Sequence, residues 1–163
     1  MTEFMTEQLV KREETLATKV KKVLLILVTA LVVWVALMVP ILIFVAFIVI
    51  AVDIFLFPRM NVEFEYLYFN GDLDIDKIFN KSSRKRMFRT NIKEDMYLIA
   101  PTGASELYQF REMKKLDFST RNPENKTYTM IATHKGEKVQ VIFEPNEEIL
   151  KGIRDLAPRK IIL

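Results

Sequence analysis

The sequence contains no cysteine and a single histidine, His134, in 163 residues. The lack of cysteine excludes disulfides, thiolate nucleophiles and cysteine-based metal sites, and it is consistent with a reducing compartment. One histidine excludes most metal and triad chemistry that relies on imidazole. Because His134 lies beside a Lys135-Gly136 turn, we expect it to be structural or solvated rather than catalytic.

Glycine is scarce, and its four positions are isolated from one another. The chain therefore has no G-x-G-x-x-G or Walker loop to bind a nucleotide, and no serine lies in a complete G-x-S-x-G motif. The net charge of +3, from 24 basic and 21 acidic residues, is too balanced to indicate nucleic-acid binding. We predict no catalytic residue, no metal, no cofactor and no nucleic-acid partner.

Charge is absent from the thirty residues between Val23 and Val52, which excludes a simple soluble globule. The apolar run continues past Asp53 to Phe57, and its length of about 35 residues would reach roughly 52 Å as one helix, against about 30 Å of hydrocarbon. Pro40 favours a break because it lacks an N–H and disfavours a helical residue before it. We predict a transmembrane helical hairpin over residues 23–57, with a single kinked, tilted span as the alternative.

Basic residues flank the apolar run on both sides, with Lys19, Lys21 and Lys22 before it and Arg59 after it. Cytoplasmic ends of membrane segments carry an excess of lysine and arginine. Two spans therefore predict a multi-pass cell-membrane protein whose N- and C-termini are both cytoplasmic. The run is far longer than the apolar region of a signal peptide and no small-x-small cleavage site follows it, so we expect the anchor to persist.

Asp53 is the one ionisable residue inside the apolar run, and such residues are functional candidates by default. We interpret it as structural, with its carboxylate reaching the interface or pairing with Lys21 or Lys22 on the antiparallel helix. Trp34, the only tryptophan, lies near the middle of the hairpin and is expected to serve packing.

The segment before the apolar run, residues 1–22, is predicted to be a cytoplasmic N-terminal arm. Its apolar residues Met5, Leu9, Leu16 and Val20 are 4, 7 and 4 positions apart, which is a helical stripe. We expect a short surface helix leading into the first span; contact with a partner or a lipid surface is the alternative.

After Pro58 the composition changes, and residues 59–163 are long enough for one small cytoplasmic domain. Apolar and charged residues alternate over 62–68, and Asn70-Gly71 then supplies a two-residue hairpin turn, so we predict a strand that returns over 73–79. This register gathers five carboxylates on one face of the hairpin: Glu63, Glu65, Asp72, Asp74 and Asp76. They lie on rigid strands and not in a calcium-binding loop, which argues against a metal.

A basic run without any acidic residue follows from Lys81 to Lys93. A third strand formed by this run would neutralise the acidic face, and we favour this cross-strand pairing. The alternative is an outward role, because anionic lipid attracts each nearby lysine or arginine by about 1 kcal/mol, screened over about 8 Å. The candidates for contact with lipid or a partner are Lys81, Arg84, Lys85, Arg86 and Arg89.

The rest of the chain reads as further strands and a final helix. Asn146 can cap a helix over 147–157, and the apolar end of the chain is expected to dock on the sheet or the membrane. The other expected elements are a strand at 96–99, a short helix or irregular segment at 105–115, a turn at 122–125, and a hairpin of 127–134 with 137–144.

Three segments resemble a family of small two-span bacterial membrane proteins of unknown function: E-F-E-Y-L-Y-F-N-G-D-L-D-I-D-K-I at 63–78, E-P-N-E-E-I-L-K-G-I at 144–153 and A-P-R-K at 157–160. The order of strands and the final helix also resemble bacterial pleckstrin-homology-like (PH-like) domains. The resemblance implies an α+β protein of the bacterial inner membrane, with a transmembrane helical hairpin followed by a mainly antiparallel β domain that a C-terminal helix closes. A shared fold does not transfer a ligand.

These observations lead to two hypotheses about function. In the first, the chain is a non-enzymatic, membrane-tethered cytoplasmic interaction domain that binds a protein partner or the anionic lipid headgroups of the inner leaflet. In the second, it is an accessory subunit of a larger membrane complex and acts through its hairpin on a membrane-protein partner.

Overall fold

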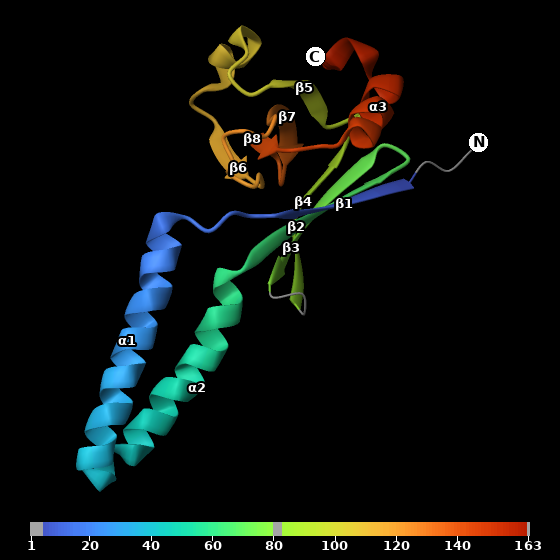
Figure 1. Cartoon of the computed structure of the whole chain (residues 1–163). Coiled ribbons are helices and arrows are strands. Elements are labelled where there is room, and N and C mark those ends of the chain that lie inside the picture. The colour runs from blue at the N-terminus through green and yellow to red at the C-terminus, as the bar shows by residue number, and fades with distance from the viewer. Residues whose placement is uncertain (1–4, 80–82, 163) are drawn as a thin grey trace. The chain divides into compact units, whose positions relative to one another are not determined.

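The computed structural model describes residues 5–79 and 83–162 (Figure 1). The chain forms two compact units. One combines the described part of residues 1–13 with that of residues 63–163, and the other consists of residues 14–62. The apolar helices are thus inserted into the β-rich unit, between its first strand and its second.

The inserted unit is a pair of helices joined by a tight turn. Its elements are α1 (Leu16–Met38), the 3₁₀ turn η1 (Pro40–Leu42) and α2 (Ile43–Met60). Val39 is extended at the break and Pro40 opens the next turn, which confirms the predicted role of Pro40. Both helical segments, Leu16–Met38 and Pro40–Met60, are long and apolar enough to cross a membrane by length and composition.

Asp53 pairs differently from the prediction. The Thr29 hydroxyl of α1 donates a hydrogen bond to its carboxylate. Lys22 instead contacts the Glu14 carboxylate at 2.5 Å and the Asn61 side-chain oxygen at 2.9 Å. The predicted pair of Asp53 with Lys22 is wrong because seven residues of α1, about 10 Å of helix rise, separate Lys22 from Thr29.

The first sheet has the order β1-β2-β3-β4. Its strands are β1 (Met5–Lys11), β2 (Val62–Phe69), β3 (Asp72–Phe79) and β4 (Ser83–Asn91). The predicted turn between β2 and β3 is confirmed, since Asn70 and Gly71 both have positive φ, 47° and 98°. A β-bulge interrupts the pairing of β3 with β4 between Ile75 and Asp76.

Strand β1 replaces the surface helix that the spacing of apolar residues predicts for the N-terminal arm. It pairs antiparallel with β2, from Met5 opposite Phe69 to Lys11 opposite Glu63. Every second residue of β1 points inward, and Val10 is only 6 % exposed. The helix prediction is wrong for residues 5–11, because the free edge of β2 offers hydrogen-bond partners that local periodicity does not reveal. Residues 16–22 are helical, as expected, and form the first turns of α1.

The second sheet has the order β5-β7-β8-β6, with β6 parallel to β8 and the other pairs antiparallel. Its strands are β5 (Met96–Pro101), β6 (Lys114–Asp117), β7 (Tyr128–His134) and β8 (Glu137–Phe143). The hairpin predicted at Lys135-Gly136 is confirmed, with φ of 52° and 83°. The segment expected as a short helix contains the 3₁₀ helix η2 (Ser105–Phe110), after which β6 begins.

The core lies between the inward faces of the two sheets. Tyr66 of β2 meets Phe143 of β8 edge to face at 5.7 Å between ring centroids, and Phe64 meets Phe118 at 5.5 Å. Helix α3 (Glu147–Leu156) closes the core and follows β8 after a short connection (Figure 1). Its Asn146 cap is confirmed, since the side-chain oxygen accepts the Ile149 N–H at 2.9 Å.

The described end of the chain docks on the second sheet, as predicted. After the 3₁₀ turn η3 (Pro158–Lys160), Ile161 bridges Ile99 of β5, and the Ile162 N–H donates to the Ile99 carbonyl at 2.8 Å. The Lys160 ammonium donates to the carbonyls of Lys93 and Met96, each at 2.7 Å. The tail therefore covers part of the β5 edge.

The position of β1 predicts that residues 63–163 do not form a stable unit by themselves. Joining residues 5–13 to residue 63 through a Gly/Ser linker of about five residues, a normal length for a strand connection, should restore cooperative unfolding in urea. Residues 63–163 alone should lose it, because β2 then exposes an unpaired edge. Equal unfolding midpoints for the two proteins would contradict a structural role for β1.

Candidate anion-binding surface

The outer face of the first sheet carries a ladder of ion pairs. Asp74 lies opposite Arg89 and Asp76 opposite Arg86 in the register of β3 with β4. Arg89 contacts Asp72 at 3.0 Å and Asp74 at 3.4 Å, while Arg86 contacts Asp74 at 3.4 Å and Asp76 at 3.7 Å. The predicted neutralisation of the acidic face by the basic run is therefore confirmed.

Glu65 of β2 extends the ladder and is only 5 % exposed. It accepts a hydrogen bond from Arg84 at 2.7 Å. Burial is the main cause that raises the pKa of the Glu65 carboxyl, and a hydrogen bond shared with Glu7 adds to it, while Arg84 opposes the rise. Arg84 is thus the positive partner of the buried Glu65 carboxylate.

This arrangement divides the predicted lipid-contact residues into two groups. Arg84, Arg86 and Arg89 are held in ion pairs on the outer face. Lys85 lies on the inward side of β4, directly opposite Lys77 of β3. Lys81 falls outside the described residues.

Lys77 and Lys85 form the next inward-facing pair after Ile75 and Phe88, which are fully buried in the core. Like charges directly opposite each other on paired strands are destabilising. Burial first, and then the charges of Arg12 and Lys85, lower the pKa of Lys77. Among the described residues neither lysine has an ion-pair partner.

Arg12, just after β1, brings a third cation close enough to act on Lys77. Its guanidinium stacks on the Phe64 ring at 4.7 Å and forms an ion pair with Asp117 at 3.4 Å. It also donates to the carbonyls of Asp117 at 2.5 Å and Ser119 at 3.3 Å. Burial is the main cause that lowers the pKa of Arg12, and Arg121 contributes.

Asp117 is the carboxylate that pairs with Arg12 and Arg121. Although burial alone would raise its pKa, hydrogen bonds from Ser119 and Arg121 and the charge of Arg12 outweigh burial, so the pKa of Asp117 is lowered. Arg121 contacts it at 2.9 Å. This acid does not neutralise Lys77 or Lys85. We call the group of Arg12, Lys77 and Lys85 the basic mouth.

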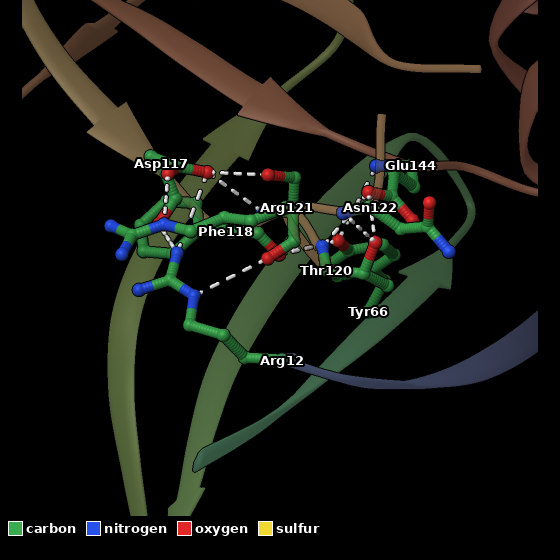
Figure 2. Close-up of polar contacts among 9 residues, drawn as sticks. Arg12, Tyr66, Asp117, Phe118, Thr120, Arg121, Asn122 and Glu144 are labelled. Atoms are coloured by element: carbon green, nitrogen blue, oxygen red, sulfur yellow. Dashed lines mark hydrogen bonds and ion pairs between the residues drawn. The ribbon is translucent and has the colours of Figure 1, made fainter. Parts of the chain in front are cut away.

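A buried polar network supports the segment beneath Arg12 (Figure 2). The Tyr66 hydroxyl donates to the Phe118 carbonyl at 2.7 Å and accepts the Glu144 N–H at 3.3 Å. Glu144 in turn accepts the Thr120 N–H and hydroxyl at 2.8 and 2.7 Å. Thr120 also accepts the Glu13 N–H at 2.8 Å, so the network ties the end of β1 to the second sheet.

Chain connectivity places the basic mouth at one particular end of the sheet. This is the end where β1 finishes at Lys11 and β2 starts at Val62. Only four residues separate Lys11 from α1, and a single residue separates α2 from β2. The chain therefore leads from this end of the sheet directly into both apolar helices.

A second basic feature is a groove of about 550 Å³ between the start of β7 and α3. Lys126, Lys151 and Arg154 line it together with Tyr128 and Glu147. Among the described residues, none of its three cations forms an ion pair. The groove thus combines an aromatic side chain with an excess of positive charge.

His134 and Trp34, which the sequence also singled out, lie outside the basic mouth and the groove between β7 and α3. His134 packs against the Phe88 ring at 5.1 Å, and burial, followed by nearby lysines, lowers its pKa. Trp34 is 59 % exposed on α1. In the described parts of the chain, no group of three or more His, Asp or Glu side chains could hold a metal ion.

Sequence reasoning missed Lys77 and Arg12. Lys77 could have been found from the sequence. It lies two residues after Ile75 and four after Leu73, so strand alternation places it on the inward face, where an apolar residue is expected. Arg12 carried none, since its place depends on β1 being a strand. Lys85 was predicted as a contact residue because of its charge, but its position on the inward face of β4 was not predicted.

The raised pKa of Glu65 predicts a pH dependence of stability. Folded Glu65 holds its proton more tightly than an unfolded glutamate with a pKa near 4.5, so the free energy of unfolding should fall as the pH rises through the interval from 4.5 to the folded value. Glu65→Gln should flatten this slope in thermal unfolding of the detergent-solubilised chain. Glu124→Gln, an exposed control, should leave it unchanged; an unaltered slope in Glu65→Gln would refute the assignment.

A family model described as "Bacterial PH-like domain (DUF6106)" matches residues 2–163. Searches of curated proteins and of solved structures returned no match. The match agrees with the observed arrangement of two apolar helices, mainly antiparallel sheets and a C-terminal helix. Because the family model covers almost the whole chain, the protein belongs to this bacterial PH-like domain family.

Proposed function

We propose that this protein is a non-enzymatic, membrane-tethered domain whose basic mouth binds anionic phospholipid headgroups of the cytoplasmic leaflet. The observation that carries the proposal is the direct opposition of Lys77 and Lys85 without an acidic partner among the described residues. A phosphate group between them would relieve their repulsion. Arg12, fixed by Asp117 and Ser119, supplies a third donor with a defined orientation.

The attachment to the membrane rests on the two apolar helices and on the charges at their ends. Lysine and arginine accumulate on the cytoplasmic side of membrane segments, and here basic residues flank both helices. In this proposal both chain termini and the PH-like unit are cytoplasmic, in the inner membrane of a bacterium. The short connections from the sheet to α1 and α2 then keep the basic mouth near the headgroups.

The attraction would orient the domain and not recruit it, because the helices already hold the chain in the bilayer. Each cation near an anionic surface contributes about 1 kcal/mol, so Lys77 and Lys85 together contribute about 2 kcal/mol, roughly a 30-fold bias. The arginines of the outer ladder add little, since carboxylates already balance them.

A second candidate function is the binding of an acidic protein segment in the groove between β7 and α3. The unpaired charges of Lys126, Lys151 and Arg154 favour it. PH-like domains include both lipid and protein binders, and the fold does not decide between them. Charge reversal in the groove and in the basic mouth therefore separates the two functions.

The lipid proposal predicts a change at the basic mouth when anionic lipid is present. The chain has no cysteine, so Ser83→Cys provides a unique site for an environment-sensitive dye beside the mouth. In nanodiscs, the emission of the dye should shift to shorter wavelength when about a third of the lipid is anionic, and the shift should weaken above about 1 M salt as the Debye length falls to about 3 Å.

Substitution of both lysines, Lys77→Gln with Lys85→Gln, should reduce this shift by most of its amplitude. The matched control, Lys114→Gln with Lys115→Gln, removes the same charge from exposed positions of β6 and should leave it intact. The same spectrum in neutral and anionic nanodiscs would exclude headgroup binding by the basic mouth.

The proposed topology predicts which positions react with a membrane-impermeant thiol reagent added outside intact cells. Ile41→Cys, in the turn between α1 and α2, should be labelled, whereas Glu124→Cys, in the PH-like unit, should be labelled only after permeabilisation. Labelling of Glu124→Cys from outside would reverse the topology and remove the inner-leaflet proposal.

A further inference from the structure

The helical hairpin carries a groove of about 510 Å³ that contains its one carboxylate. Thr29, Ala30, Val33 and Trp34 of α1 line the groove together with Asp53 of α2. The lining residues of α1 recur every three or four positions, so they form one face of the helix. The groove thus combines a small residue and a large exposed aromatic ring from α1 with an ionisable group from α2.

Asp53 lies well inside the apolar part of the hairpin. Lys22 and Asn61 contact each other at one end of the helix pair, whereas Asp53 receives its hydrogen bond from Thr29, two turns further along α1. Two turns correspond to about 10 Å of helix rise. The carboxylate is thus held below the level of the nearest lysine and has a neutral hydroxyl as its partner.

The chain contains no cation that could balance Asp53 within the apolar run. From Val23 to Phe57 it is the only ionisable residue. An ionised carboxylate inside the hydrocarbon is costly, and such residues face a bundle interior or a partner. The groove exposes Asp53 on the surface of the hairpin, where a cation from another helix would offset this cost.

The groove is suited to the close approach of a helix. Ala30 lies beside Thr29 and leaves room for a neighbouring backbone, as small residues do at membrane helix interfaces. Trp34, 59 % exposed, adds a large contact surface one turn away. A second copy of this chain is disfavoured as the occupant, because a symmetric pair would bring two Asp53 carboxylates together at the same depth without a cation.

We propose that this groove binds a transmembrane helix of a different membrane protein, one that presents a lysine or arginine at the depth of Asp53. The inference rests on the proposed membrane insertion of the hairpin but not on headgroup binding by the basic mouth. Asp53 recognises the cation, Thr29 orients the carboxylate, and Ala30 and Trp34 provide the packing surface. The chain then acts as the acidic member of a helix assembly within the bilayer.

The test uses the full chain in lipid vesicles with synthetic single-span leucine-alanine helices as probes. One probe carries lysine about one third of the way from its cytoplasmic end, and a matched probe carries leucine there. Energy transfer from a dye on Ile41→Cys to the probe should show at least tenfold tighter association with the lysine helix, which corresponds to about 1.4 kcal/mol. Asp53→Leu should abolish this preference and Asp53→Glu should retain it.

Ile48→Leu, an exposed position of α2 that does not line the groove, is the matched control and should keep the preference. Flotation of the vesicles shows whether each variant is inserted, so a chain that fails to float contradicts the membrane part of the proposed function instead. Equal association of an inserted chain with the lysine and leucine helices would overturn the inference. Asp53-dependent energy transfer between copies of the chain would overturn it too, in favour of self-association.

Discussion

Pairing of β1 with β2 closes the first sheet around the inserted helices and sets the position of both of their ends. The two strands are separated by the whole helical unit in sequence, yet Lys11 lies opposite Glu63 in the sheet. Their antiparallel pairing brings the start and the end of the insertion to the same end of the sheet. A helical hairpin suits this position, because its two ends also lie side by side. The contacts of Arg12 and Glu13 with the segment around Ser119 then fasten that end of the sheet to the second sheet.

The basic residues of β4 divide between the two faces of the sheet, because alternate residues of a strand face opposite sides. Arg84 and Arg86 point outward to the carboxylates, whereas Lys85 points inward to Lys77. The β-bulge shifts the alternation by one residue, so that Arg89 also points outward. The carboxylates of the outer face thus pair with the arginines, whereas Lys77 and Lys85 remain opposite each other on the inward face without an acidic partner among the described residues. The net charge of the chain therefore does not indicate this surface, whereas the charge of each face of the sheet does.

The two proposed sites lie in different units of the chain and use opposite charges. The basic mouth offers cations in an aqueous setting, where each contributes modestly and salt weakens it. The groove of the hairpin offers one carboxylate in an apolar setting, where a single complementary charge has a larger effect. A protein built in this way can bind lipid headgroups through one unit and a neighbouring membrane helix through the other. The outcome of either test leaves the other site open to its own test.

Elements with local signals can be predicted from the order of residues alone. The uncharged run and Pro40 define the two helices, Asn70-Gly71 and Lys135-Gly136 define two hairpins, and Asn146 defines the start of α3. Alternation over β2 and β3, followed by the basic run, was enough to predict the ladder of ion pairs. The helices, turns and cap depend on neighbours within a few residues, and the ladder joins strands that follow one another in the chain, so periodicity and turn chemistry suffice.

The other features depend on partners that are distant in sequence, so they become visible only in the folded chain. The apolar spacing of the N-terminal arm is compatible with a helix, but the open edge of β2 makes it a strand. Arg12 joins Lys77 only once that strand is in place, and Lys85 faces inward because β4 pairs with β3 in one particular register. The partner of Asp53 depends on how far α1 and α2 overlap, which selects Thr29 over Lys22. Composition carries no information about such long-range register.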